Sequence, residues 1–184
     1  MRIVVCVKHV PDMQSERRFE GGRLVRGEDD VLNELDENAI EAAVQLKETE
    51  EDAGREAEVV ALTMGPEDAE DALMRALQMG ADRAYIVSDE FLEGSDVITT
   101  ASVLSVAIAK IADECGPVDL VITGMASLDA MTSMLPGALA AKAHMPLLGL
   151  ARSMSVEDGT VTIERSVDGF TETLRAALPA VVSV

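Results

Sequence analysis

The chain has 184 residues, of which 48% are hydrophobic, and 34 acidic residues outweigh 15 basic ones to give a formal net charge of −19. This length suits one domain with a sizeable core, and we expect residues 1–184 to form a single domain. So acidic a chain repels phosphate backbones and anionic lipids, which excludes nucleic acids and membrane surfaces as expected partners. No uncharged apolar run approaches the roughly 18 residues of a membrane span, and the first residues lack a signal-peptide pattern, so we expect a cytoplasmic protein.

Short apolar runs alternate with longer helical patterns along the first three quarters of the chain. The apolar runs are rich in valine and isoleucine without strict polar alternation, as in strands that are covered on both faces. They lie at residues 2–8, 57–64, 83–89 and 118–124, and the helical patterns lie at 35–48, 66–80, about 95–116 and 137–143. Strands that alternate with helices predict a doubly wound α/β fold with a mainly parallel, Rossmann-like sheet.

Two segments depart from this alternation. Residues 17–26, "RRFEGGRLVR", place Gly21-Gly22 between two short runs and predict an excursion hairpin. After Pro146, Asp158-Gly159 and Asp168-Gly169 are turn signals between alternating segments. We therefore expect an antiparallel C-terminal meander that extends to the end of the chain.

Side chains that could support catalysis or bind a metal are sparse. Cys6 and Cys115 form no CxxC pair and are interpreted as reduced packing residues, with Cys6 also a candidate to line a site. His9 and His144 are isolated, so metal-ligand spacing is absent. The glutamate-rich residues 47–58 are interpreted as a solvated helix end. No spacing indicates paired catalytic carboxylates, so we do not expect an enzyme.

A polar loop after residue 123 is the main candidate site. In an open parallel sheet, ligands bind outside the carboxyl ends of the strands, where this loop lies and where Lys8 and Met64-Gly65 follow two other strands. The loop leads into a helix, whose first amides suit a phosphate. Thr132 and Ser133 would either donate hydroxyls to a ligand or cap the helix, and the spacing leaves both open. Neither GxGxxG nor a P-loop is present.

Several stretches of the sequence resemble one protein family. They are "VCVKHVPD" at the start, "LNELDENAIEAAVQLKE" at 32–48, "VVALTMGPEDAEDALMRALQMGADRAYIVSD" at 59–89, "VDLVITG" before the loop and "LPAVVSV" at the end. In this order, along nearly the whole chain, they closely resemble the beta subunit of electron transfer flavoproteins.

The resemblance implies a function that the residue patterns alone do not. Such a subunit has an adenine-nucleotide-binding α/β fold and pairs with an alpha subunit that holds most of a redox-active FAD. The complex carries electrons from dehydrogenases to a quinone oxidoreductase or another acceptor. Ordinary members bind AMP in the beta subunit, whereas electron-bifurcating members bind a second FAD there. By match to the family pattern, the nucleotide residues would be Cys6, Lys8, Asn33, Met64, Gly65, Gly124, Ser127, Asp129, Thr132, Ser133, Met134 and Leu135.

This chain differs from the family pattern in two places. The family's loop commonly reads D-G-D-T-G-Q-V-G-P, whereas residues 129–137 read "DAMTSMLPG", so any positive φ would be costly. We expect AMP rather than FAD, because Met131, Met134 and Leu135 would narrow the crevice. Family members also continue past "LPAVVSV" into a dehydrogenase-recognition loop and an arm around the alpha subunit, so we expect this chain to lack that extension.

Two other functions remain possible from the residues alone. A stand-alone nucleotide-binding protein of the universal-stress type shares the broad architecture. An adenylating enzyme on a related fold would need a phosphate signature such as S-G-G-x-D-S after the first strand, where this chain reads "KHVPDMQS". The beta-subunit interpretation accounts for more of the chain than either.

Overall fold

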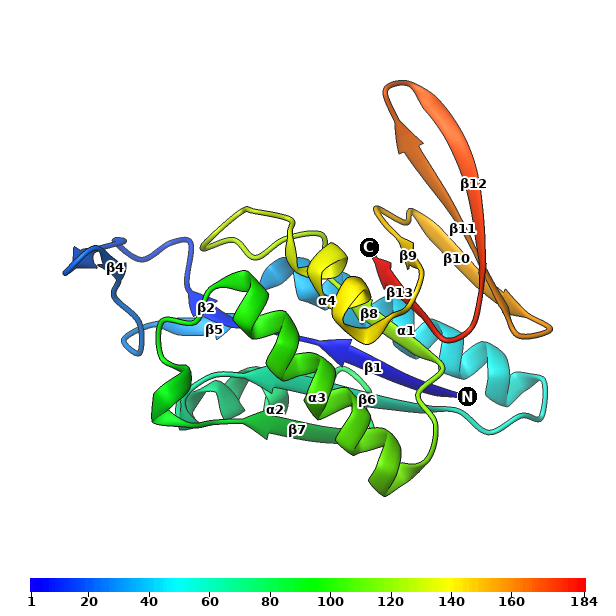
Figure 1. The fold of residues 1–184 in the computed structure, drawn as a ribbon, viewed down its shortest axis with the longest axis horizontal. Coiled ribbons are helices and arrows are strands. Elements are labelled where there is room, and N and C mark those ends of the chain that lie inside the picture. Colours follow the sequence, from blue (N-terminus) through cyan, green and yellow to red (C-terminus); the bar gives the residue numbers. More distant parts are fainter.

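A parallel sheet of six strands forms the centre of the molecule, as the sequence predicts (Figure 1). The computed structural model describes all 184 residues. The strands lie in the order β7-β6-β1-β8-β13-β9, and every neighbouring pair is parallel. Their bounds are β1 Arg2–Cys6, β6 Glu58–Met64, β7 Arg83–Val87, β8 Leu120–Thr123, β9 Leu147–Leu148 and β13 Ala180–Ser183.

Four α-helices cover the two faces of this sheet. The bounds are α1 Glu34–Asp52, α2 Glu70–Gln78, α3 Val97–Cys115 and α4 Leu135–Ala143, with short 3₁₀ turns η1 at Glu67–Ala69 and η2 at Glu90–Leu92. Alternate β1 residues divide between two cores: Val5 packs in the core that contains residues of α1 and α2, and Val4 in the core that contains residues of α3 and α4. None of the helices combines the length and apolar character needed to cross a bilayer.

The start of α3 and the end of α2 follow capping signals in the sequence. The Asp96 carboxylate accepts a hydrogen bond of 2.7 Å from the Thr99 amide, so Asp96 caps α3. Gly80 lies just beyond α2 with a φ of +116°, a conformation that glycine adopts without strain. Residues 47–52 form the last turns of α1, so the first half of the glutamate-rich stretch 47–58 is a helix end, although Glu50 within it is buried.

The strand order reverses next to β1. From β1 the chain passes through α1 to β6 and through α2 to β7, moving outward in one direction. It then crosses back through α3 to β8, on the other side of β1. The ends of β1 and β8 are neighbours, with Cys6 beside Thr123 in the parallel register. In sheets of this kind, ligands bind at such a switch point, beyond the carboxyl ends of the strands.

The C-terminal region confirms one prediction and corrects another. The antiparallel meander is present as β10 Ser153–Glu157, β11 Thr160–Val167 and β12 Phe170–Ala177, and the β11–β12 hairpin projects from the sheet in Figure 1. The prediction that the meander extends to the end of the chain is wrong. β13 is fully buried between β8 and β9 and parallel to both, so its hydrophobic residues belong to the central sheet.

The predicted excursion hairpin is present and belongs to a longer excursion. β3 Phe19–Glu20 and β4 Arg23–Leu24 pair across Gly21 and Gly22, which both have positive φ. At the base of the excursion, β2 His9–Pro11 pairs antiparallel with β5 Asp30–Leu32. We call residues 12–29 between these two strands the strap. Figure 1 shows the strap leaving the sheet at the end where the loop after β8 also lies.

Candidate functional site

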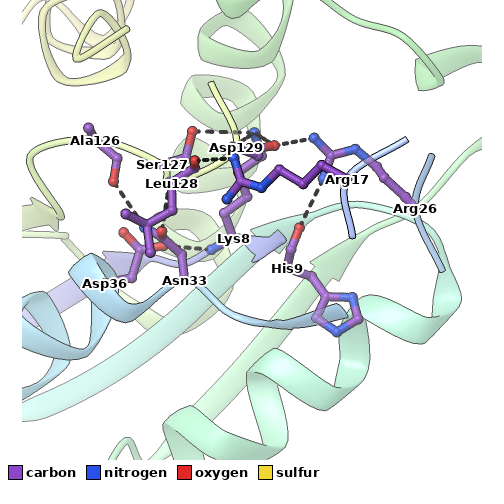
Figure 2. Close-up of polar contacts among 10 residues, drawn as sticks. All are labelled: Lys8, His9, Arg17, Arg26, Asn33, Asp36, Ala126, Ser127, Leu128 and Asp129. Atoms are coloured by element: carbon purple, nitrogen blue, oxygen red, sulfur yellow. Dashed lines mark hydrogen bonds and ion pairs between the residues drawn. The ribbon is translucent and has the colours of Figure 1, made fainter. Parts of the chain in front are cut away.

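The loop between β8 and α4, residues 124–134, is held against the start of α1 by one side chain. Asn33 is fully buried, and its Nδ2 donates to the Ala126 carbonyl at 3.0 Å while its Oδ1 accepts from the Leu128 amide at 3.0 Å (Figure 2). The backbone N–H of Asn33 donates to the Lys8 carbonyl at 2.9 Å. Asn33 therefore ties the β8–α4 loop to the end of β1, and it acts as a positioning residue for the loop.

Asp36, in the first turn of α1, joins the same two strand ends. Its buried carboxylate accepts a hydrogen bond of 2.8 Å from the Lys8 amide and a second one from the Gly124 amide. Burial raises the pKa of Asp36 to about 7, although hydrogen bonds from Asn33, Lys8 and Gly124 oppose this rise. The carboxyl group thus fixes the distance between β1 and β8 where the candidate site begins.

The raised pKa of Asp36 predicts that stability falls as the pH increases from about 4 to about 7. Over this range the unfolded chain releases the Asp36 proton while the folded chain retains it, so the folded state binds more protons. Below this range both states are protonated, and above it the loss stays constant. A shift of about three pKa units corresponds to at most about 4 kcal/mol.

An Asp36→Asn variant isolates this contribution, because asparagine cannot ionise. We expect the stability of the original chain relative to the variant, measured by urea unfolding, to be higher at pH 4.5 than at pH 7.5. A relative stability that is constant or rises with pH would contradict a raised pKa of Asp36.

An ion-pair cluster around Asp129 holds the near half of the loop, residues 124–129. The Asp129 carboxylate, whose side chain is 1% exposed, lies 2.8 Å from the Lys8 ammonium and also pairs with the Arg26 guanidinium. Burial by itself raises the pKa of Asp129, but hydrogen bonds from Lys8 and Arg26 and the Lys8 charge outweigh it and hold that pKa well below its usual range. Arg17 adds a hydrogen bond of 3.0 Å to the Leu128 carbonyl.

The far half of the loop, residues 130–134, includes hydrogen-bond donors that have no partner. Met131 and Ser133 adopt φ values of +50° and +51°, so the loop takes a left-handed path at non-glycine residues at a cost of about 1–2 kcal/mol each. The N-cap of α4 is Met134, and no side chain caps the helix, so the capping interpretation of Thr132 and Ser133 is wrong. The amides of Thr132, Ser133 and Met134 have no acceptor, and both hydroxyls are exposed.

The other predicted residues surround this loop at different depths. Cys6 is buried beneath it, and burial, helped by the Asp36 charge, raises the pKa of its thiol to about 12, so the thiol stays protonated. Met64 is the last residue of β6 and Gly65 follows it, on the opposite side of β1 from the loop. Met131 and Met134 are 60% and 53% exposed, and Leu135 is half-buried, so the narrowing of the crevice by these side chains stays a prediction.

The two main cavities do not coincide with the loop. One, of about 350 Å³, lies within the strap and is lined by four acidic side chains as well as by Arg17 and Arg18. The other, of about 440 Å³, lies between α1 and β10. At the loop itself, Asp129 pairs with Lys8 and Arg26. No group of histidine, cysteine, aspartate and glutamate side chains is placed to bind a metal.

Sequence reasoning missed three residues of this site: Arg17, Arg26 and Asp36. Asp36 has the appearance of an ordinary solvent-facing acid in an amphipathic helix, and only the fold buries it. The arginines had a detectable signal, because four arginines lie within residues 17–26 of a chain with only 15 basic residues. That local concentration could have marked the excursion as part of an anion site.

Comparison with known proteins assigns the family. The family model described as the electron transfer flavoprotein domain matches residues 22–184. The chain is 42% identical to the electron transfer flavoprotein subunit beta of Mycobacterium leprae and 41% identical to that of Mycobacterium tuberculosis, in each case over 99% of this chain and 68% of the relative. It is 34% identical to the caffeyl-CoA reductase-Etf complex subunit CarD of Acetobacterium woodii, over 100% of this chain and 68% of the relative. The chain therefore belongs to the electron transfer flavoprotein beta-subunit family.

Proposed function

We propose that this chain is the nucleotide-binding subunit of a heterodimeric electron carrier. It binds AMP at the β8–α4 loop and supports an alpha subunit that holds the electron-transferring FAD. The complex takes electrons from dehydrogenases and passes them to a quinone oxidoreductase or another acceptor, and the chain alone is not an enzyme. Family membership supports the carrier role, and the two free cysteines are in keeping with a cytoplasmic location.

The nucleotide proposal rests on one observation: at the switch point, one half of the β8–α4 loop is held by buried contacts and the other half has free donors. Asn33 and Asp129 fix its near half by buried contacts, while Thr132 and Ser133 leave their hydroxyls free ahead of α4. Free amides at a helix start, next to free hydroxyls, are suited to bind a phosphate. Rigid support on one side and unpaired donors on the other are the features of a preformed ligand site.

A second FAD in place of AMP is the alternative that the loop itself leaves open. AMP and FAD share an adenosine-phosphate half, so the free amides and hydroxyls of the loop suit either ligand. The stand-alone, universal-stress-like alternative has no support from the family assignment.

The test is to express the chain alone and together with an alpha subunit of the same source. We expect co-expression to yield a heterodimer from which denaturation releases FAD and AMP in equal amounts, identified by mass and absorbance. The chain expressed alone should release AMP without FAD and should not pass electrons from an acyl-CoA dehydrogenase to a dye.

Different results would contradict different parts of the proposal. Two FAD molecules and no AMP per heterodimer would assign the second-FAD alternative. Release of no nucleotide from this chain in either form would refute the nucleotide site. Failure to form a complex, or electron transfer by the chain alone, would refute the carrier role.

A further inference from the structure

The strap brings two arginines to the β8–α4 loop. Arg26 pairs with Asp129 and donates to the His9 carbonyl at 3.4 Å, and Arg17 donates to the Leu128 carbonyl at 3.0 Å. Figure 2 shows both side chains directed toward the loop, together with Lys8. The β2–β5 pair anchors the base of the strap and so restricts where the Arg17 and Arg26 side chains can lie.

The other two strap arginines are paired elsewhere. Arg18 pairs with Glu28 within the strap, and Arg23 lies 2.8 Å from Glu93, at the end of η2. Arg17, by contrast, forms no ion pair at all and contacts only a carbonyl oxygen.

Three cationic side chains therefore meet at the loop in a strongly acidic protein. Lys8, Arg17 and Arg26 converge on it, and Asp129 is the one carboxylate that pairs with any of them. Lys8 and Arg26 share this one carboxylate, and Arg17 forms no ion pair, so the three cations have only one ion-pair partner at the loop. A nucleotide monophosphate carries close to two negative charges at neutral pH.

The paired cations can still reach a ligand. The side chains of Lys8 and Arg26 remain 41% and 38% exposed although both contact Asp129. A guanidinium has five N–H donors, so Arg26 can hold Asp129 with one edge and an anion with another. The strap cavity is a poorer place for an anion, because Glu16, Glu28, Asp29 and Asp30 line it.

We propose that Arg17 and Arg26 bind the phosphate of the nucleotide and make the site selective for a phosphorylated adenosine over adenosine itself. This inference rests on the proposed function, because it assumes that the β8–α4 loop takes an adenine nucleotide. Lys8 supplies the third charge, and Asp129 holds Lys8 and Arg26 in position. The strap is thereby a part of the ligand site, beyond its role as a surface excursion.

The test compares AMP with adenosine, titrated by calorimetry into the nucleotide-stripped complex of this chain with its FAD-loaded alpha subunit. We expect the double variant Arg17→Gln/Arg26→Gln to bind AMP about 10- to 100-fold more weakly, with adenosine affinity unchanged within about twofold. The matched control is Arg18→Gln/Arg23→Gln, which removes the same charge from the same strap. We expect the control to bind both ligands as the original complex does.

Each contrary outcome has a distinct meaning. Equal weakening of AMP and adenosine in the Arg17/Arg26 variant would mean that these arginines only hold the loop, which overturns the inference alone. Equal weakening of AMP in the control would assign the effect to long-range charge and would overturn it as well. Failure of the original complex to bind either ligand would overturn the proposed function and this inference with it.

Discussion

Replacing Gly124 with alanine is expected to lower the free energy of unfolding by about 2–4 kcal/mol. A Cβ atom at Gly124 would lie 2.5 Å from an Asp36 carboxylate oxygen and 2.8 Å from the Leu35 carbonyl oxygen. The first contact involves a buried carboxyl group held by hydrogen bonds, and the second involves the backbone of α1, so neither neighbour can move without breaking contacts. Urea unfolding measures the loss.

Gly137 provides the matched control for this variant. It lies in the first turn of α4, and a Cβ atom there would meet only a Leu147 methyl group at 3.9 Å. Because alanine favours the helix over glycine, Gly137→Ala should leave stability unchanged or raise it by up to about 1 kcal/mol. Equal losses at the two positions would mean that the contact with Asp36 does not limit the approach of β8 to α1.

The same substitution should also weaken nucleotide binding. The Gly124 amide donates to Asp36, so displacement of this residue moves the first residue of the β8–α4 loop away from α1. The effect of Gly124→Ala on stability and on binding therefore has one origin. Asp36 and Gly124 set the spacing between the ends of β1 and β8, and this spacing determines where the loop lies.

Local patterns predicted most of the fold because their causes are local. Buried parallel strands have continuous apolar runs, and α3 begins at the capping residue Asp96, both of which are visible in a short window of sequence. β13 was misassigned because its four residues follow the meander directly, while its partners β8 and β9 lie more than thirty residues earlier in the chain. No pattern within a short window of sequence shows which distant strands pair.

From the sequence, only those residues of the candidate site could be predicted that lie next to a strand end or match the family pattern. The switch-point rule and the family pattern together selected Lys8, Asn33 and Asp129, which the structure joins by direct contacts or through the loop. Arg17 and Arg26 could not be placed, because the direction in which the strap folds back decides what their side chains contact. Side-chain burial likewise decides the pKa of Asp36, and burial depends on the whole fold.

Replacing both Thr132 and Ser133 with alanine is expected to weaken AMP binding by roughly two orders of magnitude or more. The two hydroxyls precede α4 and make no hydrogen bond within the protein, so both are free to donate to a phosphate. Hydrogen bonds to charged groups contribute about 1.5–3 kcal/mol each, and two of them account for an effect of this size. Stability should change by no more than about 0.5 kcal/mol, because neither hydroxyl caps the helix.

The matched control is Thr171→Ala/Thr173→Ala, which removes two exposed hydroxyls from β12 on the projecting hairpin. Calorimetric titration of the stripped protein with AMP should show full affinity for the control and the loss for the Thr132/Ser133 variant, while urea unfolding should show both folded. Unchanged AMP affinity in the Thr132/Ser133 variant would mean that the loop amides and the strap arginines hold the phosphate without the two hydroxyls. Because these amides depend on the left-handed conformations of Met131 and Ser133, the backbone path would then be a determinant of the site.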